Sequence, residues 1–193
     1  MPSAEAAPTV VATEQPARPG SLHRGPPAYA SGMARIGAPD VGMGEHVDWA
    51  LHRPEMAAGM GALSTAVYDN TRLSIREREA ARWTIAVIND CAVCRDTRAK
   101  NAESNGIVDG YYALVEDWRN ADGLSRRERL AAEFAQRFAL DHLAMDDEFW
   151  SRLHDAYHDD ELADLTMCCA MFLGLGRALA VMGVRAPDQR IIV

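Results

Sequence analysis

Residues 89–98, with the sequence NDCAVCRDTR, carry two cysteines whose spacing could support redox chemistry. Asn89 and Asp90 are residue types that cap helices, so we expect a helix to begin at Cys91. Cys91 and Cys94 then lie one turn apart, close enough to form a disulfide, and the unpaired N–H groups of a helix start favour a thiolate. Such a pair suits peroxide reduction or disulfide exchange, in which one thiolate attacks and the other resolves the product.

Two other interpretations of this cysteine pair remain open. It could supply half of a zinc site, although the remaining cysteines, Cys168 and Cys169, are adjacent and no histidine pair with ligand spacing lies near them. It could also be two small apolar residues of a core. Cys168 and Cys169 themselves lie in the most apolar segment of the chain, which favours buried and unreactive thiols.

Composition excludes several classes of protein. The 193 residues suffice for one domain with extensions, and the net charge of −8 makes nucleic acid and anionic membranes poor partners. Four unevenly spaced cysteines and the lack of a signal-peptide pattern favour a cytoplasmic protein with reduced thiols. The longest apolar stretch, MCCAMFLGLGRALAVMGV, is interrupted by Arg177, and we expect a buried helix there instead of a membrane span.

The elements that must position the cysteines are helical. Residues 1–40 are rich in Ala, Pro and Gly and predict an irregular N-terminal arm, whereas residues 41–193 predict a helical domain. No segment shows sustained strand alternation, so the fold class is all-α. Helix starts, caps and breakers place the expected helices at 54–68, 75–88, 91–106, 109–118 and 147–157, with two more that begin after Ser125 and after Asp159 or Asp160.

Two capping boxes and one apolar face support these boundaries. Ser74 with Glu77, and Ser125 with Glu128, have the spacing at which a serine and a glutamate cap a helix start reciprocally. In the last helix, one face carries Leu162, Leu165, Cys169, Phe172, Leu173 and Gly176.

The stretch LSIREREAARWTIAVINDCAVCRDTRAKNAESNGI resembles the carboxymuconolactone decarboxylase and alkylhydroperoxidase D-like family. The resemblance continues through LSRRERLAAEFAQRFA, DDEFWSRLHDAYHDDELADL and LGLGRALAVMGV, and covers about residues 45–184. Its most specific element is Glu79, twelve residues before Cys91. The resemblance implies a compact all-helical domain that assembles as a homo-oligomer, commonly a trimer or hexamer.

The redox branch of that family implies a role for each residue. Cys94 would attack a hydroperoxide, Cys91 would resolve the product, and Glu79 would act as the base. No cofactor or metal site is visible in the sequence, so the electrons would come from an external thiol reductant.

Two positions depart from the family pattern, Arg98 and Val93. Val93 lies between the cysteines, where the family often has an aromatic residue or a histidine. Arg98 stands where the family has a histidine four residues after the second cysteine; it cannot relay protons near neutral pH, but it could stabilise a thiolate from the same helix face. His142, His154 and His158 are candidate replacements, and surface histidines are the alternative interpretation of all three.

Glu79 has an alternative interpretation of its own. It belongs to a charged run, residues 76–82, that would ordinarily be a solvated helix face. Twelve residues of straight helix span about 18 Å. Glu79 could therefore approach the cysteines if the chain turns near Asn89, or if it comes from another subunit.

Three functions follow from these observations. The first is a thiol-dependent oxidoreductase that reduces hydroperoxides or disulfides through Cys91 and Cys94, assisted by Glu79 and Arg98. The second is a lyase of the decarboxylase branch that acts on a small carboxylated lactone, with Arg82 or Arg98 holding the carboxylate. The third is a non-catalytic oligomeric member of the family.

Overall fold

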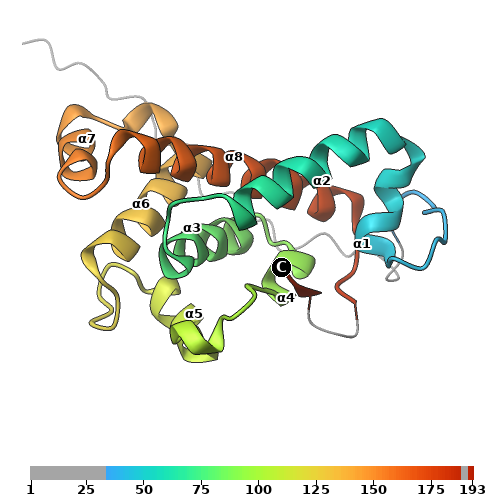
Figure 1. Ribbon diagram of the computed structural model, residues 1–193, viewed down its shortest axis with the longest axis horizontal. Coiled ribbons are helices and arrows are strands. Elements are labelled where there is room, and N and C mark those ends of the chain that lie inside the picture. Colours follow the sequence, from blue (N-terminus) through green and yellow to red (C-terminus); the bar gives the residue numbers. More distant parts are fainter. Residues whose placement is uncertain (1–33, 188–190) are drawn as a thin grey trace, which may run out of the picture. The chain divides into compact units, whose positions relative to one another are not determined.

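Helix starts in the computed structural model follow the capping residues of the sequence, over the described residues 34–187 and 191–193. The expected arm, residues 1–40, lies mostly outside this range, and its boundary at residue 40 stays a prediction. Figure 1 shows α1 (Glu45–Asp48), α2 (Pro54–Asp69), α3 (Ile75–Ile88), α4 (Ala92–Asp96), α5 (Asp109–Glu116), α6 (Arg126–Leu140), α7 (Asp147–His154) and α8 (Asp159–Met182). Short 3₁₀ turns lie at Trp49–His52, Glu103–Asn105 and His142–Ala144.

This architecture confirms the all-α fold class. Both predicted capping boxes form: the Ser74 and Ser125 hydroxyls accept the N–H groups of Glu77 and Glu128, whose carboxylates accept the serine N–H groups in return. α8 ends at Gly183, whose φ of 66° is the left-handed conformation that glycine adopts without strain.

The helix expected from Cys91 to Gly106 is wrong in its length. α4 has five residues, and Thr97 then takes an extended conformation in which its hydroxyl donates to the Val93 carbonyl. Thr97–Arg98 forms strand β1, which pairs in parallel with strand β2 (Ile191–Ile192). The chain reaches Gly106 through a 3₁₀ turn. The residues after α4 therefore pair with a segment more than ninety residues away instead of continuing the helix.

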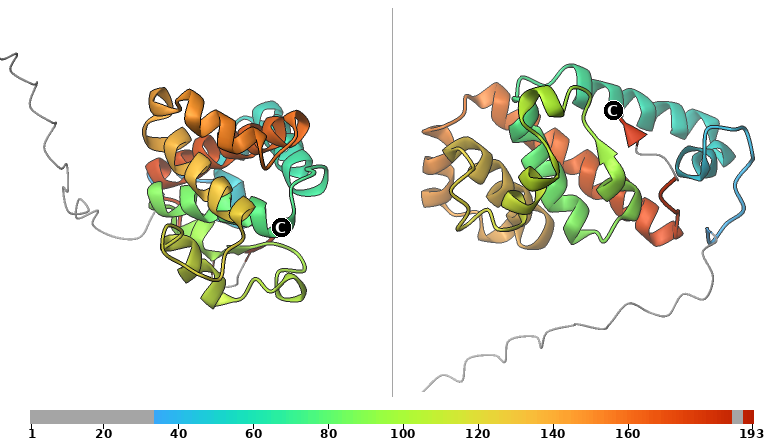
Figure 2. Two further views of the ribbon diagram at one scale, coloured as in Figure 1. Left: turned by 90° about the vertical axis from the view of Figure 1, so that its left-hand side faces the viewer. Right: turned by 90° about the horizontal axis from the view of Figure 1, so that it is seen from below.

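The core is organised around α3. This helix packs against α5, α6 and α8, and α4 folds back onto it. α2 lies along α8 in both views (Figures 1 and 2). The predicted apolar face of α8 is buried at Leu162, Leu165, Cys169, Phe172 and Gly176.

The opposite face of α8 is apolar as well. Met167 and Val181 are 59% and 60% exposed on it. Within the described part of the chain, α8 is the one helix long and apolar enough to cross a membrane, by length and composition alone. The helix therefore combines a core face with an uncovered apolar face.

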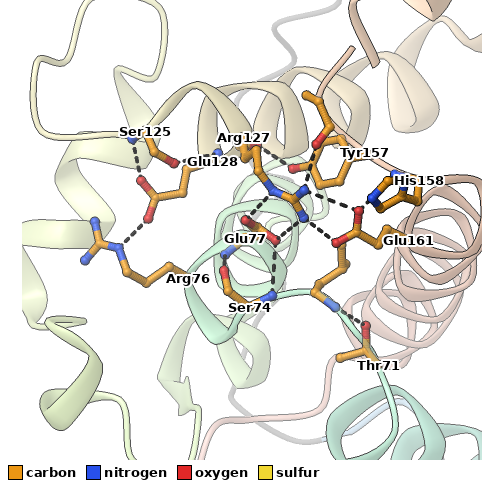
Figure 3. Close-up of polar contacts among 12 residues, drawn as sticks. Thr71, Ser74, Arg76, Glu77, Ser125, Arg127, Glu128, Tyr157, His158 and Glu161 are labelled. Carbon is orange, nitrogen blue, oxygen red and sulfur yellow. Dashed lines mark hydrogen bonds and ion pairs between the residues drawn. The ribbon is translucent and has the colours of Figure 1, made fainter. Parts of the chain in front are cut away.

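Three helix N-termini are tied together by arginine (Figure 3). Arg76 of α3 binds Glu128, the capping glutamate of α6. Reciprocally, Arg127 of α6 binds Glu77, the capping glutamate of α3, at 2.7 Å from Nε to Oε1. Nη2 of Arg127 also binds Glu161, in the first turn of α8, at 2.6 Å. These ion pairs hold the first turns of α3, α6 and α8 together.

Candidate functional site

The chain reverses between α3 and α4, at the turn that the sequence left open. Asn89 caps the end of α3, and Asp90 adopts a left-handed φ of 49°. The Asn89 side chain fixes this turn to α8, because its Nδ2 donates to the carbonyls of Phe172 and Leu173 at 3.3 and 3.2 Å. Nε of Arg177 donates to Asn89 Oδ1 at 3.1 Å. As a result, α4 lies against both α3 and α8.

Cys91 and Cys94 are joined by a disulfide at the start of α4, with their Cα atoms 5.3 Å apart. Cys91 is the N-cap residue, and its Sγ accepts the N–H of Cys94 at 3.2 Å. Cys91 is 1% exposed, whereas Cys94 is partly exposed. The two sulfurs therefore differ in access, with Cys94 on the outer side.

Cys94 lines a mostly apolar cavity of about 310 Å³, and Cys91 does not. The walls come from the segment around Trp49, α2, α3, α4, α8 and the C-terminal strand. Representative lining residues are Trp49, Met60, Tyr68, Phe172, Leu175 and Ile191. Pockets of this kind, with few polar groups, hold small and largely apolar ligands.

The floor of the site requires glycine at position 176. A Cβ atom added there would lie 3.1 Å from Cys94 Sγ and 2.9 Å from Asn89 Nδ2. α8 therefore approaches the cysteine pair as closely as a residue without a side chain permits.

Glu79 is fully buried and is joined to Cys94 through Arg82. Arg82 donates from Nε and Nη2 to the two Glu79 oxygens, at 2.8 and 2.7 Å. Its Nη1 donates to the Cys94 carbonyl at 2.6 Å and its Nη2 to the Thr97 carbonyl at 3.1 Å. The Tyr112 hydroxyl donates to Glu79 Oε2 at 3.1 Å. Although burial alone would lower the pKa of Arg82, Glu79 holds that pKa above its usual value.

The interpretation of residues 76–82 as a solvated face is wrong, since Glu77, Arg78, Glu79 and Arg82 are all buried. The sequence signal for the Glu79–Arg82 pair was a glutamate and an arginine three residues apart in a segment otherwise rich in Ala, Ile and Val. That signal did not indicate Arg82 as the residue that contacts the cysteine loop.

Arg98 lies on β1, outside the cavity that Cys94 lines. Its Nη1 donates to the carbonyls of Arg95 and Thr97 at 2.6 and 3.0 Å, and its guanidinium carbon lies 4.5 Å from the centre of the Tyr112 ring. The expected placement on the helix face of Cys94 is wrong, because α4 ends at Asp96. Electrostatic assistance from Arg98 stays a prediction, and Arg82 is the arginine that binds the Cys94 carbonyl.

His142, His154 and His158 are exposed, and His154 faces Asp159 with 3.5 Å between Nδ1 and Oδ1. None of the three lines the cavity, whereas His46, which the sequence did not single out, does.

Cys168 and Cys169 are buried, as expected, and burial raises the pKa of Cys168 to about 11 and that of Cys169 well above its usual value. In residues 34–187 and 191–193, no group of three or more His, Cys, Asp or Glu side chains is placed to hold a metal ion.

Known proteins share this arrangement of helices at low sequence identity. No protein-family model matches the chain. The uncharacterized protein YdfG of Bacillus subtilis (strain 168) is 24% identical over 113 residues, which are 58% of this chain and 77% of YdfG.

Three solved structures superpose well. A protein of unknown function from Agrobacterium tumefaciens, proposed to be the antioxidant defence protein AhpD, matches 81% of this chain and all of its own, with a TM-score of 0.68 at 19% identity. An uncharacterized peroxidase-related protein from Ralstonia eutropha JMP134, described as an alkylhydroperoxidase AhpD core, matches 73% of this chain and 75% of its own (TM-score 0.64, 19% identity). An uncharacterized peroxidase-related protein from Silicibacter sp. TM1040 matches 75% of this chain and 76% of its own, with a TM-score of 0.61 at 17% identity.

Proposed function

We propose that this chain, which has the AhpD-like helical fold, is a thiol-dependent oxidoreductase that reduces hydroperoxides through Cys91 and Cys94. The observation that carries the proposal is the unequal access of the two sulfurs. Cys94 lines the apolar cavity, and Cys91 is buried behind it within disulfide reach. An attacking thiol must meet the substrate, whereas a resolving thiol must meet only its partner sulfur.

The proposed cycle has three steps. The Cys94 thiolate attacks the terminal peroxide oxygen, breaks the O–O bond and releases an alkoxide that takes up a proton, which leaves a Cys94 sulfenic acid. The Cys91 thiol then attacks that sulfur, and water leaves as the disulfide forms. Two equivalents of an external thiol reduce the disulfide and become oxidised in turn.

Glu79 and Arg82 act in this proposal as positioning residues. Both Glu79 oxygens accept hydrogen bonds from Arg82, and one accepts another from Tyr112, so the carboxylate is held in place as the partner of Arg82. Arg82 in turn holds the Cys94 carbonyl. The assignment of Glu79 as the base, which the family resemblance implies, stays a prediction.

The lyase alternative receives less support. It needed Arg82 or Arg98 to hold a substrate carboxylate. Arg82 is 2% exposed and its guanidinium is bound to Glu79 and to two carbonyls, and Arg98 lies outside the cavity. A substrate carboxylate at Arg82 would be repelled by the negative charge of Glu79.

The test uses the reduced full-length chain and cumene hydroperoxide. Wild type should consume about one equivalent of hydroperoxide and lose two hydrogens from the peptide that contains both cysteines. Cys91→Ser should accumulate a sulfenic acid that dimedone traps at Cys94, and Cys94→Ser should be unreactive. Cys168→Ala is the matched control and should react as wild type. Unchanged consumption by Cys94→Ser contradicts the proposal, and turnover of a carboxylated lactone favours the lyase.

The proposal also has consequences for the reductant, the compartment and the oligomeric state. It requires a separate thiol reductant and a compartment that keeps thiols reduced, such as the cytoplasm. We also propose that the chain is a homo-oligomer, a trimer or hexamer, that covers the apolar residues exposed on α2 and α8: Met56, Leu63, Met167 and Val181. Light scattering at micromolar concentration tests this part, and a monomeric mass contradicts it.

A further inference from the structure

Tyr68 lines the same cavity as Cys94, and its hydroxyl has no hydrogen-bond partner among the described residues. The hydroxyls of Tyr111, Tyr112 and Tyr157 each donate a hydrogen bond, at 2.5, 3.1 and 2.6 Å. The Tyr68 hydroxyl makes no hydrogen bond to any other residue of the described chain, and Tyr68 is a lining residue of the cavity. The hydroxyl is not among the buried atoms that lack a partner, so it is accessible and free to donate to a molecule that enters the cavity.

Tyr68 and Cys94 are related through the wall of the cavity that both line. The Tyr68 ring lies 6.0 Å from the ring of Phe172, measured between centroids. Phe172 is one turn of α8, about 6 Å, before Gly176, where the helix backbone meets Cys94 Sγ. Arg82, which binds the Cys94 carbonyl, lines the same cavity. Phe172 and Arg82 thus belong to the wall that Tyr68 and Cys94 share.

The other protic groups of the cavity are less suited to meet a substrate at Cys94. The Thr97 hydroxyl donates to the Val93 carbonyl, and Arg82 is bound to Glu79. Nδ1 of His46 and Nε1 of Trp49 are buried and have no hydrogen-bond partner among the described residues. The His46 nitrogen lies against Gly44, where an added Cβ would be 3.0 Å away, and an indole N–H is too weak an acid to transfer a proton. Ser64, one turn before Tyr68 on α2, lines the cavity, but no contact ties it to the cysteine loop.

We propose that Tyr68 is the acid that protonates the leaving oxygen when Cys94 attacks a hydroperoxide, a role that the family pattern would give to a histidine. The inference rests on the proposed function. As the Cys94 thiolate bonds to the terminal oxygen and the O–O bond breaks, the Tyr68 proton passes to the departing alkoxide and yields an alcohol. The Tyr68 phenolate then takes a proton from water, so no further oxidant or reductant is needed.

The acidity of Tyr68 fits this role. Burial raises the pKa of Tyr68 to about 12, although the nearby Arg82 charge opposes the shift. The hydroxyl therefore carries its proton at neutral pH. An alkoxide is a stronger base than such a phenolate, so the transfer is favourable at the moment when the O–O bond breaks.

Tyr68→Phe is the informative variant, because it removes the hydroxyl without breaking a hydrogen bond within the described chain. The measurement is the rate constant of the reduced protein with two oxidants, cumene hydroperoxide and peracetic acid. The first releases an alkoxide that needs a proton, and the second releases a carboxylate that does not. In Tyr68→Phe the rate constant with cumene hydroperoxide should fall about 10²-fold, whereas the rate constant with peracetic acid should change little. Its iodoacetamide alkylation rate at Cys94 should equal that of wild type, and Tyr157→Phe should leave all three rates unchanged.

The outcomes separate the inference from the proposed function. Equal losses with both oxidants, or a parallel loss of alkylation rate, would assign Tyr68 a packing role and overturn the inference. An unchanged rate with cumene hydroperoxide would overturn it as well. A wild-type chain that reacts with iodoacetamide but with neither oxidant would instead overturn the proposed function, and the inference with it. If Tyr68→Phe loses helicity in circular dichroism, the same comparison is made with Tyr68→His, which keeps a proton donor and should retain part of the hydroperoxide rate.

Discussion

Arg82 donates a hydrogen bond of 2.6 Å from Nη1 to the backbone carbonyl of Cys94. This contact links the middle of α3 to the cysteine loop, twelve residues further along the chain. The guanidinium can hold this position because Glu79 neutralises it inside the protein. Arginine suits the place better than lysine, since its planar group binds a carboxylate and two carbonyls at once.

The first prediction therefore concerns Arg82. Arg82→Met should cost about 3–5 kcal/mol of unfolding free energy, because Glu79 would be left as a buried charge without its partner. The double variant Glu79→Met with Arg82→Met should recover much of that loss. Urea denaturation of both single variants and the double variant gives the coupling energy. A double variant that loses the sum of the single losses would show that the two side chains act independently.

The second prediction concerns Gly176. Gly176→Ala should cost about 1–3 kcal/mol and slow disulfide formation, since its Cβ would press on Asn89 Nδ2 and Cys94 Sγ. Gly174→Ala on the same helix is the matched control, because it meets nothing within 4 Å and should stabilise the chain by about 0.5–1 kcal/mol. Thermal unfolding and the rate of thiol loss under peroxide measure both effects. Equal behaviour of the two variants would mean that α8 lies further from Cys94 than this structure places it.

The third prediction concerns the C-terminal strand. Ile191 forms part of the cavity wall, whereas Ile192 is 60% exposed and does not line that cavity. Ile191→Ser should open the wall and raise the rate at which a bulky maleimide alkylates reduced Cys94. Ile192→Ser carries the same change in chemistry and should leave the rate unchanged. A faster reaction in both variants would point to loss of the β1–β2 pairing instead of a gap in the wall.

The fourth prediction concerns pH and Arg127. Hydrogen bonds from Arg127 hold the pKa of Glu161 below its usual value of 4.5. A carboxylate with a lowered pKa stabilises the fold above its unfolded-state pKa, and that stability is lost as the pH falls through the folded-state pKa. Arg127→Met should cost about 3 kcal/mol at pH 7, the lower end for a buried pair because Arg127 is a third exposed. The difference from wild type should shrink below pH 4.5 in urea titrations. A difference independent of pH would assign the loss to packing.

The helices could be predicted because their signals are local. Ser74 with Glu77, and Ser125 with Glu128, each lie within one turn, so the sequence alone marks both helix starts. The pairing of β1 with β2 joins segments more than ninety residues apart, and nothing in residues 91–106 indicates it. Local signals alone therefore predict a helix that continues past Asp96, where the structure has a strand.

The same distinction holds for the candidate site. The spacing of Cys91 and Cys94 alone predicts that they can form a disulfide. The predicted position of Arg98 depended on a helix that continues past Asp96, and it is wrong. Arg82 and Tyr68 acquire their places only when the turn at Asp90 folds α4 back and α2 lies along α8. A single sequence does not fix either event.

The arginine links among the helix starts have a consequence for local opening of the fold. The first turn of a helix usually frays, and its amide hydrogens exchange with solvent sooner than those of the helix centre. Here Arg127 binds Glu77 and Glu161, and Arg76 binds Glu128, so no start among α3, α6 and α8 can open without breaking a bond to another. Deuterium should therefore enter these three turns together and late. The cysteine loop at the opposite end of α3 is held by different contacts, the hydrogen bonds of Asn89 to α8 and of Arg82 to the Cys94 carbonyl. Its opening, and any change of state of the disulfide, therefore does not require the three helix starts to open.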